Sequence, residues 1–146
     1  MPKRFTLAEA QSLIPHLSRL LREAINLKSE YAEAERALQS FRERVMTMGG
    51  VVLDRERALS AKNRRDSAAG RLRHAIEQVQ ELGCVVKDLD TGLVDFPTLF
   101  RGQEVYLCWK LGEPQIEFWH GVQEGFAGRK PIDQDFRDGH QGDLAH

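Results

Sequence analysis

The sequence predicts an α+β fold, in which a long antiparallel helical hairpin packs on a small antiparallel β-meander of about four strands. Apolar residues recur at heptad spacing through the first half of the chain, and a glycine pair interrupts the pattern. After Gly83 the apolar residues take the period of strands, with glycine turns between short runs. A chain of 146 residues suits one domain with one core. We expect a single domain over 1–133, with a hairpin over 5–83, a sheet over 84–120 and a loop over 121–133, and then a polar, mobile tail over 134–146.

The first helix is predicted to begin near Leu7, because Thr6 and Glu9 form a capping-box pattern. Pro15 predicts a kink or a restart, since a proline inside a helix removes a hydrogen bond and clashes with the preceding turn. The apolar residues that follow keep a 4-3 spacing, which is typical of a coiled coil. They are Leu13, Leu17, Leu20, Ala24, Leu27, Tyr31, Ala34, Leu38, Phe41 and Val45.

Gly49 and Gly50 predict the turn between the two helices, and Gly83 predicts the C-terminal cap of the second. The polar stretch 62–67 does not continue the heptad stripe. A hairpin that projects beyond the sheet leaves apolar surface uncovered, so we expect a homodimer through the helices. The stripe on the second helix consists of Ala69, Leu72, Ile76 and Val79.

Two strands are expected over 84–89 and 93–96, and Pro97 should end the second or place it at an edge of the sheet, because proline has no N–H for a sheet ladder. A second hairpin is expected over 104–119, with its turn at Gly112 and Glu113. This register pairs Trp109 with Ile116, Leu107 with Phe118 and Val105 with His120 on the core face, and leaves Tyr106, Cys108 and Trp119 on the other.

Charge is distributed unevenly around a net value of −1. Residues 42–74 carry nine basic and four acidic side chains, whereas 75–146 carry six and thirteen. The basic middle could attract an anionic partner or the acidic half of another copy. No apolar run is long enough to span a membrane, and the N-terminus lacks the apolar middle of a signal peptide, so we expect a cytoplasmic protein. Cys84 and Cys108 have no ligand spacing and are expected to be free, buried thiols.

Four motifs occur together in the second half of the chain: GLVDFP at 92–97, VYLCWKLGE at 105–113, FWH at 118–120 and GFAGR at 125–129. In this combination the chain resembles an uncharacterised family of small bacterial proteins, a domain of unknown function with a long N-terminal helical hairpin. The resemblance covers about residues 4–132. It implies the same fold and a bacterial, cytosolic setting, and it supplies no activity and no site residues.

His120 is the candidate metal ligand or general base, with Asp95 and Glu113 among the carboxylates that could assist it. The competing interpretations are structural. His120 could be hydrogen-bonded at the sheet edge, and Asp95 could bond backbone N–H groups beside Pro97. Arg101 and Arg129 could bind a small anion, or form salt bridges to the acidic half of the chain.

The function that we expect is that of a non-enzymatic, dimeric binding or scaffold protein, with a ligand or partner surface on the Trp/His/Arg side of the sheet. One alternative is a metal-dependent or small-anion-binding enzyme that uses His120 and nearby carboxylates. Another is nucleic-acid binding by the basic hairpin, which is disfavoured because acidic residues interrupt the basic ones. No cofactor is predicted apart from the divalent metal of the first alternative. The expected binding residues are Trp109, Trp119, His120, Arg101, Arg129, Asp95 and Glu113.

Overall fold

The computed structural model describes residues 3–48 and 52–143, and it confirms the α+β class. The chain divides into two compact units. The first, which we call the sheet unit, comprises Met1–Leu21 and Glu77–His146, and the second, the hairpin unit, comprises Arg22–Ile76. Among the helices that the structure describes, none combines the length and the hydrophobicity that crossing a membrane requires.

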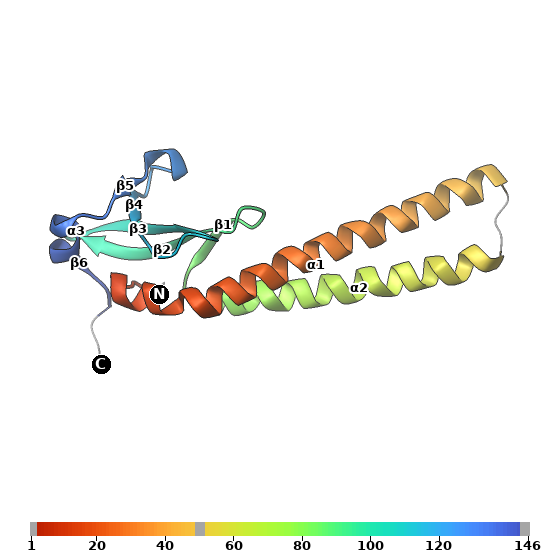
Figure 1. The fold of residues 1–146 in the computed structure, drawn as a ribbon, viewed down its shortest axis with the longest axis horizontal. Helices are drawn as coiled ribbons and strands as arrows, with labels where there is room; N and C mark the ends of the chain where they lie inside the picture. The colour runs from red at the N-terminus through yellow and green to blue at the C-terminus, as the bar shows by residue number, and fades with distance from the viewer. Residues whose placement is uncertain (1–2, 49–51, 144–146) are drawn as a thin grey trace. The chain divides into compact units, whose positions relative to one another are not determined.

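The sheet unit holds an antiparallel sheet with the strand order β1-β2-β3-β4-β5, and β6 pairs with Leu99 and Phe100 at the end of β2 (Figure 1). The first four strands are the ones that the sequence predicts, and β5 and β6 are short additions. The strands are β1 Val85–Asp88, β2 Leu93–Phe100, β3 Gln103–Lys110, β4 Phe118–Gly121, β5 Lys130–Pro131 and β6 His140–Gln141.

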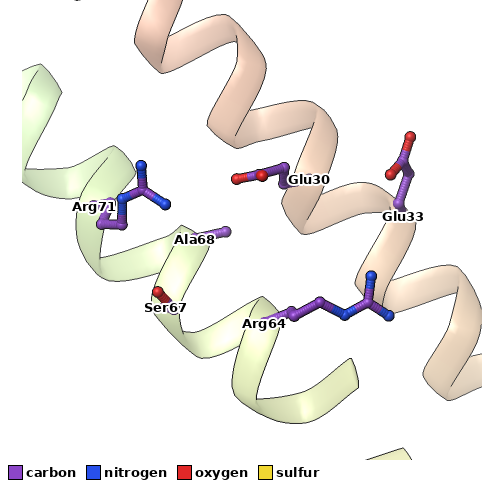
Figure 2. Close-up of a pocket in the computed structure, with 6 residues that line it drawn as sticks. All are labelled: Glu30, Glu33, Arg64, Ser67, Ala68 and Arg71. Carbon is purple, nitrogen blue, oxygen red and sulfur yellow. The ribbon is translucent and has the colours of Figure 1, made fainter. Parts of the chain in front are cut away.

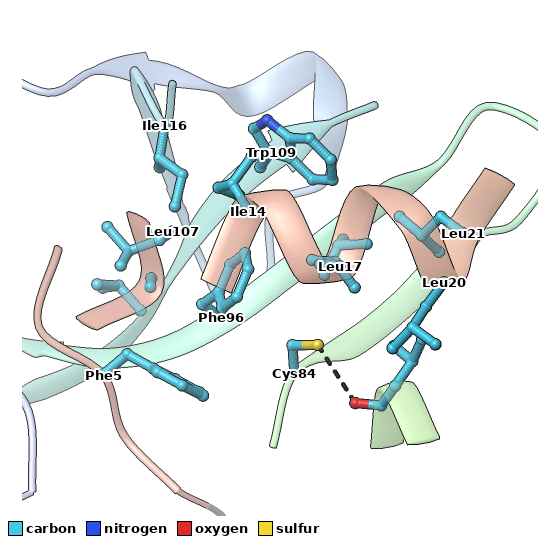
Figure 3. Close-up of a cluster of buried hydrophobic side chains, with 14 of the residues drawn as sticks. Phe5, Ile14, Leu17, Leu20, Leu21, Cys84, Phe96, Leu107, Trp109 and Ile116 are labelled. Atoms are coloured by element: carbon cyan, nitrogen blue, oxygen red, sulfur yellow. Dashed lines mark hydrogen bonds between the residues drawn. The ribbon is translucent and has the colours of Figure 1, made fainter. Parts of the chain in front are cut away.

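The first turns of α1 (Leu7–Met48) cover one face of this sheet, which we call the core face (Figure 3). Phe5 and Phe96 meet edge to face there, with ring centroids 5.4 Å apart. Each large side chain buried in such a cluster stabilises the fold by about 1.5–3 kcal/mol. The chain before and within α1 contributes Phe5, Ile14, Leu17, Leu20 and Leu21, and the sheet contributes Val94, Phe96, Val105, Leu107 and Trp109.

Of the two alternatives for Pro97, the one that ends the strand is wrong, because β2 continues to Phe100. The carbonyl oxygen of Pro97 accepts a hydrogen bond from the N–H of Phe5 at 2.7 Å, on the side of β2 that faces away from β3. The N and C=O of a strand residue point to the same side, so the missing N–H of Pro97 also faces away from β3. The β2–β3 ladder therefore loses no hydrogen bond at Pro97.

The predicted register of the second hairpin is wrong by one residue. His120 pairs with Tyr106, and Trp119 pairs with Leu107, so Trp119 lies on the core face and His120 on the opposite one. The reason is the connection, which runs from 111 to 117 instead of forming a two-residue turn. Trp109 Nε1 donates to the carbonyl oxygen of Glu113 at 3.0 Å and holds this longer loop in place.

Residues 134–141 of the expected polar tail fold onto the sheet unit instead, as α3 (Gln134–Gly139) and β6. Phe136 is 1% exposed and stacks on Phe100 and Trp119, with ring centroids 4.9 and 5.0 Å apart. The Asp133 carboxylate caps α3 by accepting a hydrogen bond from the Phe136 N–H. One aromatic side chain thus anchors a segment that is otherwise polar. The loop expected over 121–133 also contains the short helix η1 (Phe126–Gly128) and β5.

In the hairpin unit, α1 from Arg22 onward lies beside α2 (Val52–Glu81). The predicted turn at Gly49 and Gly50 lies outside the described residues. The restart expected at Pro15 does not occur, because α1 is one helix through that position. The stripe predicted on α2 is off by one residue at two positions. Ala68 and Ala75 are buried there, whereas the predicted Ala69 and Ile76 are only partly buried. Of the described side chains in this unit, the buried ones are Ala24, Leu27, Ala34, Leu38, Ala61, Ala68 and Ala75.

As predicted, the polar stretch 62–67 carries no apolar side chain that continues the stripe on α2, and Arg65 takes the inner position instead. Arg65 lies half-buried between Ala61 and Ala68 and forms an ion pair with Glu35 of α1 at 2.8 Å. Helix α2 ends as predicted, because Gly83 has a φ of 95° and its N–H donates to the carbonyl oxygen of Gln80.

Two glycines of the sheet unit allow a matched test of the fold. Gly92 and Gly102 both have positive φ, 71° and 79°, so alanine would be strained at either position. A Cβ on Gly102 would meet open space, whereas a Cβ on Gly92 would overlap Leu111 Cβ. We expect Gly102→Ala to cost about 1–2 kcal/mol. Gly92→Ala should cost a further 1–3 kcal/mol or so for overpacking.

Urea unfolding followed by circular dichroism and tryptophan fluorescence measures the two costs. Equal losses for Gly92→Ala and Gly102→Ala would contradict the contact between Gly92 and Leu111.

Candidate functional site

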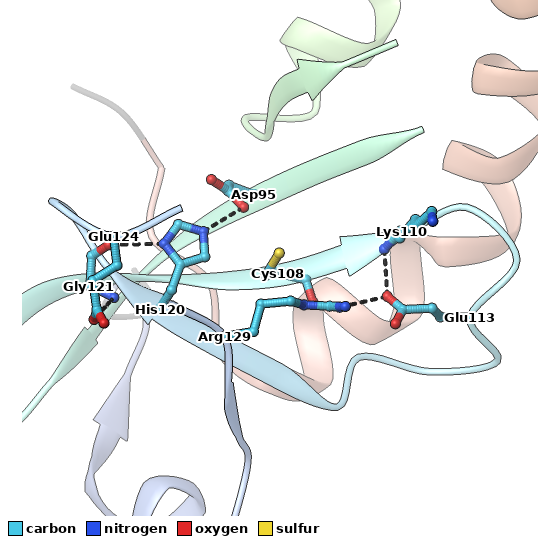
Figure 4. Close-up of polar contacts among 8 residues, drawn as sticks. All are labelled: Asp95, Cys108, Lys110, Glu113, His120, Gly121, Glu124 and Arg129. Carbon is cyan, nitrogen blue, oxygen red and sulfur yellow. Dashed lines mark hydrogen bonds and ion pairs between the residues drawn. The ribbon is translucent and has the colours of Figure 1, made fainter. Parts of the chain in front are cut away.

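The face of the sheet opposite the core face, which we call the polar face, carries the candidate site (Figure 4). The register places Asp95 of β2 opposite Cys108 of β3, and Phe118 of β4 opposite Cys108. His120 stands opposite Tyr106, one step diagonally from Cys108. Because side chains alternate along a strand, these five residues share one face.

A two-residue turn sets this arrangement. Arg101 and Gly102 connect β2 to β3 and both have positive φ, 53° and 79°, as a type I′ hairpin turn requires. The ladder that starts there pairs Phe100 with Gln103 and continues without a shift to Asp95 and Cys108. The alignment of the polar face thus follows from the turn.

Asp95 and His120 form a buried pair, with side chains only 2% and 4% exposed. His120 Nε2 lies 3.0 Å from Asp95 Oδ1, and Nδ1 lies 2.9 Å from the carbonyl oxygen of Gly121. A carbonyl oxygen can only accept, so Nδ1 carries a hydrogen. Nε2 and the Asp95 carboxylate then share one proton in their hydrogen bond, so both ring nitrogens of His120 form hydrogen bonds.

The Gly121 backbone is itself fixed by a side chain. Glu124 Oε1 accepts a hydrogen bond from the Gly121 N–H at 2.9 Å and pairs with Lys130. The Lys130 hydrogen bond, with the one from Gly121, holds the pKa of the Glu124 carboxyl below its usual value. Tyr106 lies beside His120, with ring centroids 5.6 Å apart. The histidine is therefore both oriented and shielded from solvent.

Cys108 completes the buried cluster. Burial raises the pKa of its thiol to about 12, and the charge of the Asp95 carboxylate and a hydrogen bond to it add to the rise. Only the thiolate is a nucleophile, so Cys108 alone is an inert, protonated thiol at neutral pH. Asp95, Cys108 and His120 each offer one ligand atom, and these atoms lie within 4.8 Å of one another.

Arg129 forms the second part of the polar face. One of its terminal nitrogens donates to Glu113 Oε1 at 2.7 Å and to the carbonyl oxygen of Cys108 at 3.2 Å. The guanidinium carbon lies 4.1 Å from the ring centroid of Phe118 and 4.7 Å from that of Phe126. Glu113 also accepts from the N–H of Lys110, so the arginine is held by a carboxylate that is itself anchored.

Phe126 marks the exposed end of this arrangement. Its side chain is 49% exposed, and Lys110 Nζ lies 5.9 Å from the centroid of its ring. We call the group formed by Lys110, Phe118, Phe126 and Arg129 the aromatic–cation surface. It offers positive charge beside an accessible ring, which suits an anionic ligand that also has an apolar part.

The structure brings some of the predicted site residues together and separates the others. Asp95 and His120 form one pair, and Glu113 and Arg129 form another. Asp95 bonds His120 rather than a neighbouring backbone N–H. The remaining three lie elsewhere: Trp109 is 1% exposed in the core, Trp119 packs on the core face, and Arg101 pairs with Asp135 at the β2–β3 turn.

Cys108, Phe118 and Phe126 belong to the site, although the sequence did not single them out. A signal for Cys108 does exist, because Asp95 and Cys108 are equally far from the pair Arg101–Gly102. A hairpin centred on that pair would have aligned them. Phe118 and Phe126 gave no comparable signal.

The hairpin unit has a polar hollow of about 170 Å³ between its helices (Figure 2). Glu30 and Glu33 of α1 lie across from Arg64 and Arg71 of α2, and the small side chain of Ala68 leaves the space between them. Two acidic and two basic groups face each other in this hollow. It therefore lacks the concentrated positive charge that nucleic-acid binding uses.

The family model described as "Uncharacterized conserved protein (DUF2203)" matches residues 3–132 of the chain. This match confirms the resemblance to a domain of unknown function. No curated protein and no solved structure matches the chain.

The two thiols give a pH-dependent prediction. Burial raises the pKa of Cys84 from 9.0 to about 11, and the pKa of Cys108 is also raised. The folded state then holds these protons at pH values where the unfolded state has released them. Stability should be fully present below about pH 9 and should fall as the pH rises toward 11, on the order of 2 kcal/mol for Cys84.

Unfolding in urea across this pH range, with chelator present, measures the loss, and Cys84→Ala should reduce it. In the native protein at neutral pH, iodoacetamide should label neither thiol, whereas denatured protein should be labelled at both. Rapid native labelling of Cys108, located by mass spectrometry, would contradict its burial.

Proposed function

The chain belongs to the family described as an uncharacterized conserved protein (DUF2203), and on that premise we propose that it is a cytoplasmic, non-enzymatic binding module. Its ligand is an acidic peptide segment that also carries an apolar side chain. The binding site is the aromatic–cation surface of the sheet unit.

The observation that carries the proposal is the position of two cations over an exposed ring. Lys110 and Arg129 lie over Phe126, which is 49% exposed and stands in the short helix η1. Arg129 is only 10% exposed and is paired with Glu113, so it orients the Phe126 ring before any ligand arrives, and Lys110 supplies the charge that meets the ligand. A preorganised site loses less conformational entropy on binding than a mobile one.

The chemistry of the polar face supports binding over catalysis. His120 is the natural candidate for a general base, but it is 3% exposed and both its ring nitrogens are engaged. Cys108 is fully buried, and its thiol is protonated at neutral pH. A substrate would have to displace the polar face to reach either group, whereas a ligand of Phe126 and Lys110 needs no rearrangement.

A peptide titration tests this function. The probe is a short glutamate-rich peptide with one leucine, and binding is followed by the chemical shifts of backbone amides. We expect shifts around Lys110, Phe126 and Arg129. Lys110→Glu and Phe126→Ala should each weaken binding about tenfold, which corresponds to 1.4 kcal/mol.

The matched controls are Lys62→Glu in the hairpin unit, which changes a similar charge, and Val122→Ala in the sheet unit, which removes a similarly exposed apolar side chain. Both should bind the peptide as the wild type does, and a lysine-rich peptide should not bind. Equal affinities for all four variants would overturn the proposed site.

We also propose that the module is a homodimer through its hairpin unit. An apolar hollow at the surface supports this part of the proposal, because monomeric proteins seldom expose large contiguous apolar patches. Leu38, Phe41 and Leu59 border a common hollow of about 300 Å³, which Arg42 and Arg55 flank. Among the side chains of this unit that the structure describes, the large exposed apolar ones are Tyr31, Val45, Met46 and Leu59.

Sedimentation equilibrium over a range of concentrations tests the dimer. Met46→Lys and Leu59→Lys should raise the dimer dissociation constant at least about tenfold, because a charge placed in an apolar interface is costly. Val122→Lys is the control, since Val122 is 50% exposed but lies in the sheet unit. A wild-type protein that is monomeric throughout, or a dimer lost only with Val122→Lys, would exclude this interface.

A further inference from the structure

We infer that Asp95, Cys108 and His120 form a zinc-binding site that ties together the three central strands of the sheet. The carboxylate comes from β2, the thiol from β3 and the imidazole from β4. All three side chains are buried, and the atoms that could bind a metal lie within 4.8 Å of one another. This inference is independent of the binding function proposed for Lys110 and Phe126.

The orientation of His120 prepares one nitrogen for a metal. Nδ1 donates its hydrogen to the carbonyl oxygen of Gly121 at 2.9 Å, so the lone pair available for a metal is that of Nε2, which points at Asp95. Metal-binding histidines almost always make such a hydrogen bond with the other ring nitrogen, because it fixes the tautomer and the ring. Glu124 in turn fixes the Gly121 backbone, because its carboxylate accepts a hydrogen bond from the Gly121 N–H.

The choice of metal follows from the ligand types. A thiolate, an imidazole and a carboxylate are the three protein ligands that zinc accepts, at about 2.0–2.3 Å. Calcium and magnesium prefer oxygen ligands only, so Cys108 argues against them. Three protein ligands leave one position of a tetrahedral zinc ion for water or another small ligand.

The charge balance of the cluster also favours a divalent ion. Without metal, the protonated Cys108 thiol is neutral, and the Asp95–His120 pair shares one proton and is neutral as a whole. A zinc ion would displace two protons, the one on the thiol and the shared one. The ion's two positive charges would then be matched by the thiolate and the carboxylate, so the buried cluster would be neutral in both states. Burying an uncompensated charge is costly, and this exchange avoids that cost.

Because the three residues are buried, the ion should enter while the sheet forms. The test therefore uses the full chain, unfolded and then refolded with either zinc or cobalt, and dialysed to remove loosely held metal. Zinc content per chain is measured by mass spectrometry of the metal. Cobalt reports on the ligand itself, because a cobalt–thiolate bond absorbs in the near ultraviolet.

The chain supplies a matched control, since Cys84 is also buried but lies outside the cluster, with its Sγ on the carbonyl oxygen of Val79. We expect about one zinc ion per chain in the wild type and in Cys84→Ser, and none in Cys108→Ser or His120→Gln. The cobalt–thiolate band should follow the same pattern. Zinc should also raise the melting temperature of wild type and Cys84→Ser, and leave that of Cys108→Ser unchanged.

Several outcomes would overturn the inference. They are a wild type that retains no metal, equal metal in all variants, and a cobalt–thiolate band that disappears with Cys84→Ser. Circular dichroism identifies variants that fail to fold, and Asp95→Asn then replaces any such variant. Lys110→Glu should keep its zinc, so failure of the peptide-binding proposal and failure of the zinc site give different results.

Discussion

The register between β2 and β3 is the constraint on which the rest of the sheet unit depends. The turn at Arg101 and Gly102 sets it, and the ladder runs from there without a shift to Leu93 and Lys110. Because alternate side chains point to opposite faces, this one alignment places Phe96 under α1 and Asp95 opposite Cys108. A slip of one residue would bury a carboxylate against the apolar side chains of α1. The core and the polar cluster are thus two consequences of the same turn.

The two faces of the sheet differ in the side chains that they remove from water. The core face excludes water with apolar side chains. The polar face buries charged groups, and a buried charge needs a partner within hydrogen-bonding distance. Asp95 has His120, and Arg129 has Glu113. Removing one member of either pair would leave the other uncompensated, so these residues act as pairs and the polar face depends on all four.

The sequence predicted best the features that residues close together in the chain determine. The 4-3 spacing correctly identified the buried positions Ala24, Leu27, Ala34 and Leu38, because helical periodicity determines which side chains share a face. The cap at Gly83 is equally local. The register of β3 and β4 was missed because it depends on a contact across the chain, in which Gln11 of α1 accepts from the N–H of Ile116 in the connection. Phe136 was missed for a similar reason, since one aromatic in a polar segment does not reveal the pocket that receives it.

The candidate site was also predicted only in part, because its residues come from different strands. Asp95, Glu113, His120 and Arg129 were chosen by the chemistry of their side chains, and the structure places them in two pairs on one face. Cys108 was set aside because its neighbours in sequence offer no ligand. Spacing rules for metal sites describe ligands that one helix or one loop presents, whereas here each proposed ligand comes from a different strand. The distance between such ligands along the chain is set by strand and turn lengths, so it follows no short motif. In an antiparallel sheet, a candidate metal site therefore has to be sought by pairing strands about their turns, and the pair Arg101–Gly102 was sufficient to align Asp95 with Cys108.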